Sequence, residues 1–279
     1  MRPGSPSLPH ALAPRAPPLF SRPDPDLDTD PARRNATRHA TLTRARPSPL
    51  LSDPDYHGVT AAQVAFRGDK RWNMPALNFT ETLPFAAAAG GGGGGGGGPA
   101  APDGACVALV LLDSCPFIEK YRSDAQMAAN LAATAPAAAQ LEWIGASLAR
   151  AAASCSAVVA VGHHPVFSGG EHGDSAELKA QLRPLLEAHG ADLYLAGHDH
   201  ALIFLESGSV GYVVTGAGSE TDRTTVRTPE TRFFADESGF TVHSVNASHV
   251  LTSYVRGADG AVVFQDLRAL RAKVPRRER

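Results

Sequence analysis

Two short stretches decide the fold of this chain: SAVVAVGHHP, residues 156–165, and DLYLAGHDH, residues 192–200. Each is an apolar run that ends in a glycine and is followed at once by histidines. Such runs are typical of buried strands in a sheet with parallel neighbours. Ligands of open α/β sheets bind beyond the carboxyl ends of the strands, so both groups of histidines are expected to reach one crevice. Gly162 and Gly197 are expected to let the chain turn sharply there.

Further strands are predicted on both sides of these stretches. Residues 105–113 form a continuous apolar run, and residues 201–206 and 209–216 are shorter apolar segments. Residues 238–256 alternate between apolar and polar side chains, as an antiparallel hairpin does. Strands that alternate with helices and then give way to hairpins predict an α/β layer architecture with sheets at its centre.

Two helices are predicted between the strands. Residues 137–153 carry apolar side chains at helical spacing. Residues 175–189 form the second helix, which has Ser175 as its N-cap and stops at Gly190. Pro184 inside this helix predicts a kink or a break, because proline removes a backbone donor.

Biased segments surround and interrupt the regular part of the chain. Residues 1–50 hold half of the 22 prolines and little apolar periodicity, so they are expected to be a disordered leader. A transit peptide or a mispredicted first exon would look similar. Residues 86–102 include nine consecutive glycines and are expected to be a flexible insertion between two strands. One domain over 51–270 and a basic tail over 271–279 remain.

Composition argues against several classes of protein. Of 279 residues, 43% are hydrophobic and 19% are charged, which allows a sizeable core. The formal net charge of -2 shows no basic bias, so no nucleic-acid partner is expected. There is no apolar run of about 18 residues and no visible secretory signal, so no membrane association is expected. Three cysteines allow one disulfide at most and leave the redox compartment open.

The histidines predict a metal centre. The 11 histidines are unevenly spread and gather between residues 163 and 200. Imidazole binds zinc, iron and related metals. His198 and His200 lie one residue apart, so they can reach two adjacent ions, as a two-metal hydrolytic site requires. Asp199 between them is expected to be exposed or to support a ligand, and ordinary loop histidines remain the alternative.

Two more histidines belong to the first group. His164 is expected to be structural or to line the pocket, because its neighbour His163 fits the ligand position better. His172 follows nine residues after His163 in the loop SGGEHG. It is either a solvated loop residue or a group that contacts phosphate or protonates a leaving group.

Taken together, these motifs resemble those of the purple acid phosphatases, and best those of their small, tartrate-resistant branch among the calcineurin-like metallophosphoesterases. VGHHPVFSGGEHG (161–173) is similar to the family's Gly-His-x-Pro segment, and the Gly-His-Asp-His of 197–200 to its Gly-His-x-His segment. RWNMP (71–75) resembles an Arg-Trp-x-x-Pro stretch, LLDS (111–114) a central Asp-Thr strand, and RFFADESGF (232–240) the closing hairpin. The resemblance runs from about residue 52 to residue 268.

The resemblance implies a sandwich of two mixed β-sheets flanked by helices, here without its first strands. It also implies acid phosphatase activity: hydrolysis of phosphate monoesters by a metal-activated hydroxide at a dinuclear centre. His163 and His198 would bind a divalent ion, Fe(II), Zn or Mn, and His200 would bind Fe(III). His172 would be the catalytic residue that contacts the substrate phosphate. The substrate would be a phosphorylated small molecule or a phosphoprotein, and the oligomeric state is left open.

The early part of the chain departs from the family pattern. The Asp-x-Gly and Gly-Asp-x-x-Tyr motifs are not found, and Ser, Asp, Pro and Asp at 52–55 replace Gly-Asn-His-Asp. Asp53 would then supply an oxygen to the divalent ion, giving a set of two histidines and one carboxylate. A truncated or mispredicted N-terminal part is therefore expected, and retention of a single metal is the alternative to the two ions that the resemblance implies.

Two alternatives to the phosphatase follow. The first is a non-enzymatic remnant that binds at most one metal, which the missing motifs favour. The second is a phosphodiesterase of the same superfamily, which the region of Trp72 and the spacing of His172 argue against. Relatives are commonly secreted or vacuolar, and the sequence leaves the location of this chain open.

Overall fold

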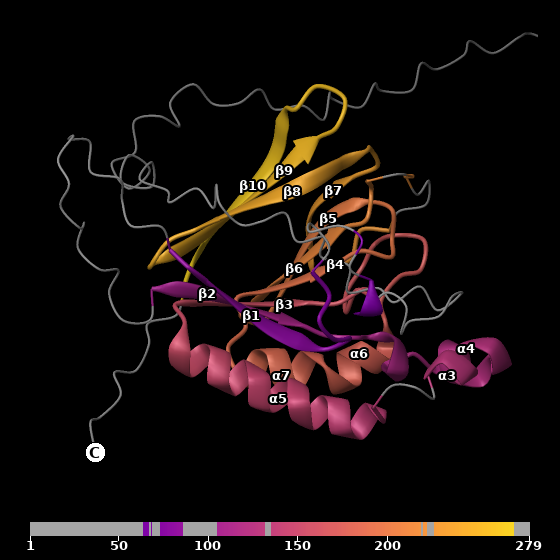
Figure 1. Ribbon diagram of the computed structural model, residues 1–279. Helices are drawn as coiled ribbons and strands as arrows, with labels where there is room; N and C mark the ends of the chain where they lie inside the picture. The colour runs from indigo at the N-terminus through magenta and orange to yellow at the C-terminus, as the bar shows by residue number, and fades with distance from the viewer. Residues whose placement is uncertain are drawn as a thin grey trace, which may run out of the picture. The chain divides into compact units, whose positions relative to one another are not determined.

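The computed structural model describes residues 64–66, 68, 73–85, 105–131, 135–218, 220–221 and 226–270. The predicted leader, the glycine-rich insertion, the basic tail, Asp53 and Trp72 lie outside these residues. Within them the chain forms three layers: helices, a large sheet and a small sheet (Figure 1).

The large sheet is mixed, and its strand order is β1-β2-β3-β4-β6-β5-β7. The strands are β1 (Phe79–Pro84), β2 (Cys106–Leu111), β3 (Ala157–Val161), β4 (Leu193–Ala196), β5 (Leu202–Ser207), β6 (Val210–Thr215) and β7 (Thr231–Ala235). Strands β2, β3, β4 and β6 run parallel, whereas β1, β5 and β7 run antiparallel to their neighbours. The carboxyl ends of β3 and β4 are therefore adjacent, which confirms the predicted crevice edge.

The small sheet is antiparallel in order β10-β9-β8. It consists of β8 (Gly239–Val245), β9 (His249–Arg256) and β10 (Val262–Ala269). The predicted hairpin over 238–256 is confirmed by β8 and β9. The expectation that 232–240 closes a hairpin is wrong, because β7 pairs with β5 in the large sheet while β8 belongs to the small one.

Period-two alternation along the strands builds a core on each face of the large sheet. On β2, Ala108 and Val110 face α5 (Ala137–Ser154), α6 (Ala176–Gln181) and α7 (Arg183–Ala188). Val107 and Leu111 face the other core, which includes side chains of the small sheet. Figure 1 shows the three helices along one face of the large sheet and β8–β10 on the opposite face.

The predicted break in the second helix is present. Ser175 caps α6 by accepting a hydrogen bond from the backbone N–H of Leu178 at 3.2 Å. The helix ends at Gln181, and α7 begins at Arg183 with Pro184 in its first turn. Proline is tolerated there because N–H groups of the first turn have no partner within the helix.

Three short helices after β2 were not predicted: η2 (Cys115–Phe117), α3 (Glu119–Ser123) and α4 (Ala125–Leu131). All three residues of η2 are buried, with Phe117 in the core beneath the helices, and α3 carries Tyr121 to the carboxyl ends of the strands. In the part of the chain that the structure describes, no helix is both long and apolar enough to cross a membrane.

One disulfide ties the large sheet to the helical layer. Cys106 at the start of β2 is bonded to Cys155, which follows α5, and the third cysteine, Cys115, is buried and free. The bridge closes a loop with a sequence separation of 49. A cross-link of this kind stabilises a fold mainly by restricting the unfolded chain.

Replacing both bridged cysteines, Cys106→Ser with Cys155→Ser, is expected to lower the free energy of unfolding by about 4 kcal/mol, the chain-entropy value for such a loop. Urea unfolding of the oxidised chain and of the double variant measures this difference. A thiol titration in denaturant should give one free thiol per oxidised chain, and three would contradict the bridge.

His243 makes the stability of the sandwich depend on pH. Its ring bonds Thr252 and Thr241 at 3.1 Å each, and burial lowers its pKa from 6.5 to about 4. Between these two values the unfolded chain binds a proton that the folded chain does not bind. This contribution to stability is therefore lost as the pH falls from 6.5 towards 4.

His243→Gln should weaken this dependence. Between pH 7 and pH 5 we expect the wild-type chain to lose about 1–2 kcal/mol more stability than the variant loses. Urea midpoints at both pH values give the comparison. His249→Gln on β9 serves as the matched control. Equal losses in the wild-type chain and in His243→Gln would contradict the assignment.

Candidate metal centre

Two imidazole nitrogens converge at the carboxyl ends of β3 and β4. His163 Nε2 lies 3.0 Å from His198 Nδ1. Two nitrogens that each lie 2.0–2.1 Å from one ion, at an angle of about 90°, are also separated by about 3 Å. The pair therefore has the spacing of two ligands of a single transition metal.

The backbone around these histidines explains their positions. Gly162 has no room for a side chain, since a Cβ there would lie 2.3 Å from the Tyr194 hydroxyl. Gly197 has no such constraint, because nothing lies within 4 Å of its Cβ position. The turn after β4 is instead made at His198, whose φ of 65 is in the left-handed region. A non-glycine residue there is strained by about 1–2 kcal/mol, a feature that clusters at functional sites.

Both converging rings are kept neutral. Burial, followed by the neighbouring His198, lowers the pKa of His163 to about 3. Burial and then the nearby His172 lower the pKa of His198 to about 4. Neutral imidazole is the form that binds a metal, so the two rings need not lose a proton at neutral pH.

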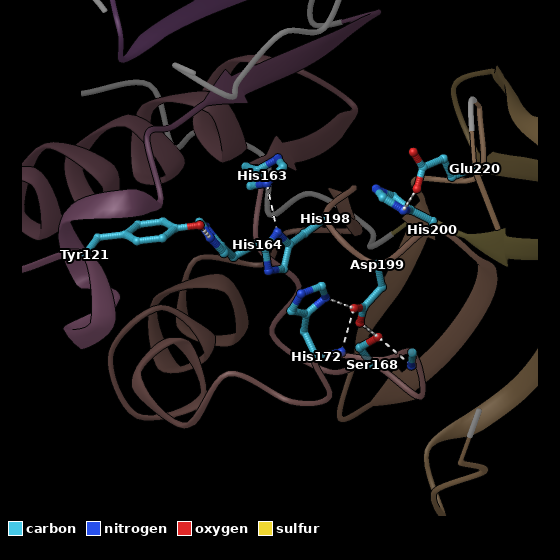
Figure 2. A network of polar contacts seen from close by, with 10 residues as sticks. Tyr121, His163, His164, Ser168, His172, His198, Asp199, His200 and Glu220 are labelled. Atoms are coloured by element: carbon cyan, nitrogen blue, oxygen red, sulfur yellow. Dashed lines mark hydrogen bonds and ion pairs between the residues drawn. The ribbon is translucent and has the colours of Figure 1, made fainter. Parts of the chain in front are cut away.

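His164 lies beside the pair but is held in a different way. Its ligand atom is within 4.8 Å of those of His163 and His198. Its Nδ1 contacts the Ser114 hydroxyl at 2.8 Å, and its Nε2 contacts the Tyr121 hydroxyl at 3.0 Å. Because both ring nitrogens already have hydrogen-bond partners, His164 packs beside the pair and is not assigned as a ligand (Figure 2).

His200 opens onto the same cavity from the other side. A cavity of about 450 Å³ is lined by His163, His198 and His200. His200 Nδ1 lies 3.7 Å from Glu220 Oε2, and Figure 2 shows this pair apart from the other histidines. The structure thus brings two predicted ligands together and leaves the third at the cavity wall, while Asp53 is outside the described residues.

His172 contacts His198 from the opposite side. The two ring centroids are 4.2 Å apart. His172 Nδ1 lies 2.8 Å from Asp199 Oδ1, and its side chain is 48% exposed. His172 and His198 both line a second cavity of about 200 Å³, next to α3. His172 therefore lies between the candidate metal site and an accessible pocket.

Several residues of this site were not identified from the sequence. Asp199 was expected to be exposed or to support a ligand, and it is fully buried and bonded to His172. Ser168, Ser114, Tyr121 and Glu220 were not singled out at all. Their roles depend on contacts across 20 to 50 positions of sequence, which local patterns do not encode.

The chain is similar to known phosphoesterases. Residues 65–202 match the model of the calcineurin-like phosphoesterase family. The tartrate-resistant acid phosphatase type 5 of Rattus norvegicus is 32% identical over 245 residues, covering 82% of this chain and 67% of that protein. The same enzyme of Sus scrofa is 30% identical over 269 residues, covering 91% of this chain and 68% of that protein.

Solved structures support the fold. GAP50, the anchor in the inner membrane complex of Plasmodium, matches with a TM-score of 0.63 at 20% identity, over 78% of this chain and 64% of that one. A purple acid phosphatase from yellow lupin, Lupinus luteus, matches with a TM-score of 0.51 at 14% identity, over 76% of this chain and 35% of that one. The chain spans about two thirds of the length of these rat and pig relatives and about half of the length of three other mammalian ones. Together with the sequence matches, these findings establish that the chain belongs to the calcineurin-like phosphoesterases and, within them, to the tartrate-resistant and purple acid phosphatase family.

Proposed function

We propose that this chain hydrolyses phosphate monoesters at a metal centre held by His163 and His198. The observation that carries the proposal is the 3.0 Å separation of their facing nitrogens. Without a metal these two half-buried rings share one hydrogen bond, and a bound ion would replace that proton as the partner of both nitrogens. Family membership supports phosphoesterase chemistry, and the match to acid phosphatases favours monoesters over diesters as substrates.

The donor set fits a transition metal better than calcium or magnesium, which prefer oxygen ligands. A bound ion would polarise the phosphate and lower the pKa of a coordinated water. We propose a dinuclear centre in which His163, His198 and Asp53 bind a divalent iron, zinc or manganese ion and His200 binds Fe(III). The shared cavity of His163, His198 and His200 supports this arrangement.

His172 is proposed to act on the substrate rather than on the metal. Its ring lies against His198 but is half exposed. From there it can donate a hydrogen bond to a phosphate oxygen, or a proton to the oxygen of the leaving group. The substrate class is a phosphorylated small molecule or a phosphoprotein.

A non-catalytic role is the second candidate. Within the described residues, the only group of three potential ligands is His163, His164 and His198, and His164 is engaged by Ser114 and Tyr121. Two imidazoles alone bind a metal weakly. One protein with this fold is described as an anchor in the inner membrane complex of Plasmodium.

Metal stoichiometry separates the two candidates. We expect two metal ions per chain, one of them iron, in elemental analysis of the freshly desalted protein. One ion or none, together with no hydrolysis of an aryl phosphate at acidic pH, would favour the non-catalytic role.

His163→Ala should remove half of the converging pair. We expect metal affinity to fall by at least about 100-fold. Losing a ligand should cost more than losing a residue that only supports a ligand, and that loss alone reaches this value. Competition with a chelator measures the affinity. His249→Ala, which changes a histidine of β9, should leave it unchanged, and equal effects of both variants would contradict the site.

His172→Ala should lower kcat by about 10²- to 10⁴-fold, the usual contribution of a general acid or base. Metal content should stay the same, because His172 is not proposed as a ligand. Steady-state hydrolysis of an aryl phosphate, with elemental analysis of the same sample, measures both quantities. An unchanged kcat would show that His172 is a solvated loop residue with no catalytic role.

A further inference from the structure

We infer that Asp199 is a positioning residue that holds the ring of His172 with Nε2 directed at the leaving group of the substrate. The inference rests on the proposed function for its catalytic part. Its structural part concerns the orientation and tautomer of His172, and it can be tested whether or not the chain is active.

Asp199 is a buried carboxylate with several donors around it. Its side chain has 0% exposure. Oδ1 accepts hydrogen bonds from the His172 backbone N–H at 2.9 Å and from His172 Nδ1 at 2.8 Å. Oδ2 accepts a bond from the Ser168 hydroxyl, which also accepts one from the Gly170 N–H at 3.0 Å. A buried charge is costly unless it is bonded in this way.

The backbone makes room for this carboxylate. A Cβ at Gly170 would lie 2.5 Å from Cβ and Cγ of Asp199, and a Cβ at Gly216 would lie 2.2 Å from its carbonyl oxygen. The left-handed backbone of His198 lets His198 turn to His163 while Asp199 turns inward to the loop 168–172 (Figure 2). The site is therefore shaped around Asp199 and not only around the metal ligands.

The contact fixes which nitrogen of His172 faces the substrate. A carboxylate accepts hydrogen bonds and cannot donate one, so Nδ1 must carry a proton. Nε2 is then the nitrogen left for the second cavity, which His172 lines together with His198. A carboxylate that orients a histidine in this way selects its tautomer.

This tautomer is the form of the ring that remains after His172 has given a proton to the leaving group. As the bond between phosphorus and the leaving oxygen breaks, Nε2–H of the doubly protonated ring passes its proton to that oxygen. Water supplies the new oxygen on phosphorus, and one of its protons restores the ring. The ring left after the transfer is neutral and carries its proton on Nδ1, facing Asp199. Asp199 therefore holds the ring in one orientation before and after the transfer, through its bonds to the backbone N–H and to Nδ1 of His172.

A role in bracing the loop alone would also involve Asp199, because Asp199 joins Ser168 to His172. The two roles differ in their dependence on the leaving group. A positioning residue matters most when the leaving oxygen needs a proton, as for an alkyl phosphate. A residue that only stabilises the loop lowers kcat for alkyl and aryl phosphates to the same extent.

The test uses the full-length, metal-loaded chain and Asp199→Asn, which keeps the shape but removes the charge. NMR of ¹⁵N-histidine-labelled protein at pH 8.5 reports the tautomer of His172, with His172→Gln identifying its signal. Kinetics with an alkyl and an aryl phosphate report the acid step. Asp192→Asn is the control, since Asp192 is also buried but bonds the Val158 N–H at the other end of β4.

We expect His172 in the wild-type chain and in the control to carry its proton on Nδ1. In Asp199→Asn, a population with the proton on Nε2 should appear. In this variant, kcat should fall about 10- to 100-fold for the alkyl phosphate and only a few-fold for the aryl phosphate.

Three outcomes overturn all or part of the inference. If His172 of the wild-type chain carries its proton on Nε2, the whole inference is wrong, whether or not the chain is active. This measurement does not depend on a variant that might fail to fold. Equal losses of kcat for both esters overturn the catalytic part of the inference and show that Asp199 only stabilises the loop that joins Ser168 to His172. A wild-type chain that shows the Nδ1 proton but no turnover supports the positioning and refutes the proposed function alone.

Discussion

The parallel pairing of β3 with β4 is the interaction on which the site depends. Val161 pairs with Leu195, and the ladder continues past the strands, where the Gly162 N–H donates to Leu195 O and the Gly197 N–H donates to His163 O, each at 3.0 Å. These bonds bring two loops from distant parts of the sequence into register. A slip of one residue would turn the side chains to the other face of the sheet and separate the imidazoles.

Signals within a few residues predicted most of the fold. The apolar runs before the histidines are strands, and the sequence predicts the capped start, the break and the stop of the second helix through Ser175, Pro184 and Gly190. These features follow from local backbone chemistry, since a hydroxyl caps, a proline lacks an N–H and a glycine accepts a φ of 71. The histidine pair is predictable for the same reason, because strand ends in a parallel sheet meet at one edge.

Long-range packing decided what the sequence left open. The choice of Cys106 and Cys155 as partners depends on β2 lying beside β3. The left-handed turn falls on His198 and not on Gly197, although glycine is the residue that a local rule assigns to it. The burial of Asp199 requires two glycines, one from the loop after β3 and one after β6, that approach it in space. The chain segment 232–240 crosses between sheets because β7 pairs along the edge of β5, whereas β8 pairs with β9 in the small sheet.

The charge of the candidate site argues for an anionic substrate. The two converging ligands are neutral imidazoles, so they leave the charge of a bound cation uncompensated. Among the described residues, the carboxylates of Asp199 and Glu220 contact His172 and His200 rather than the pair. A cation held mainly by neutral donors attracts anions at short range. A phosphate ester, the proposed substrate, would satisfy that attraction, while Asp199 and Glu220 contact the surrounding histidines.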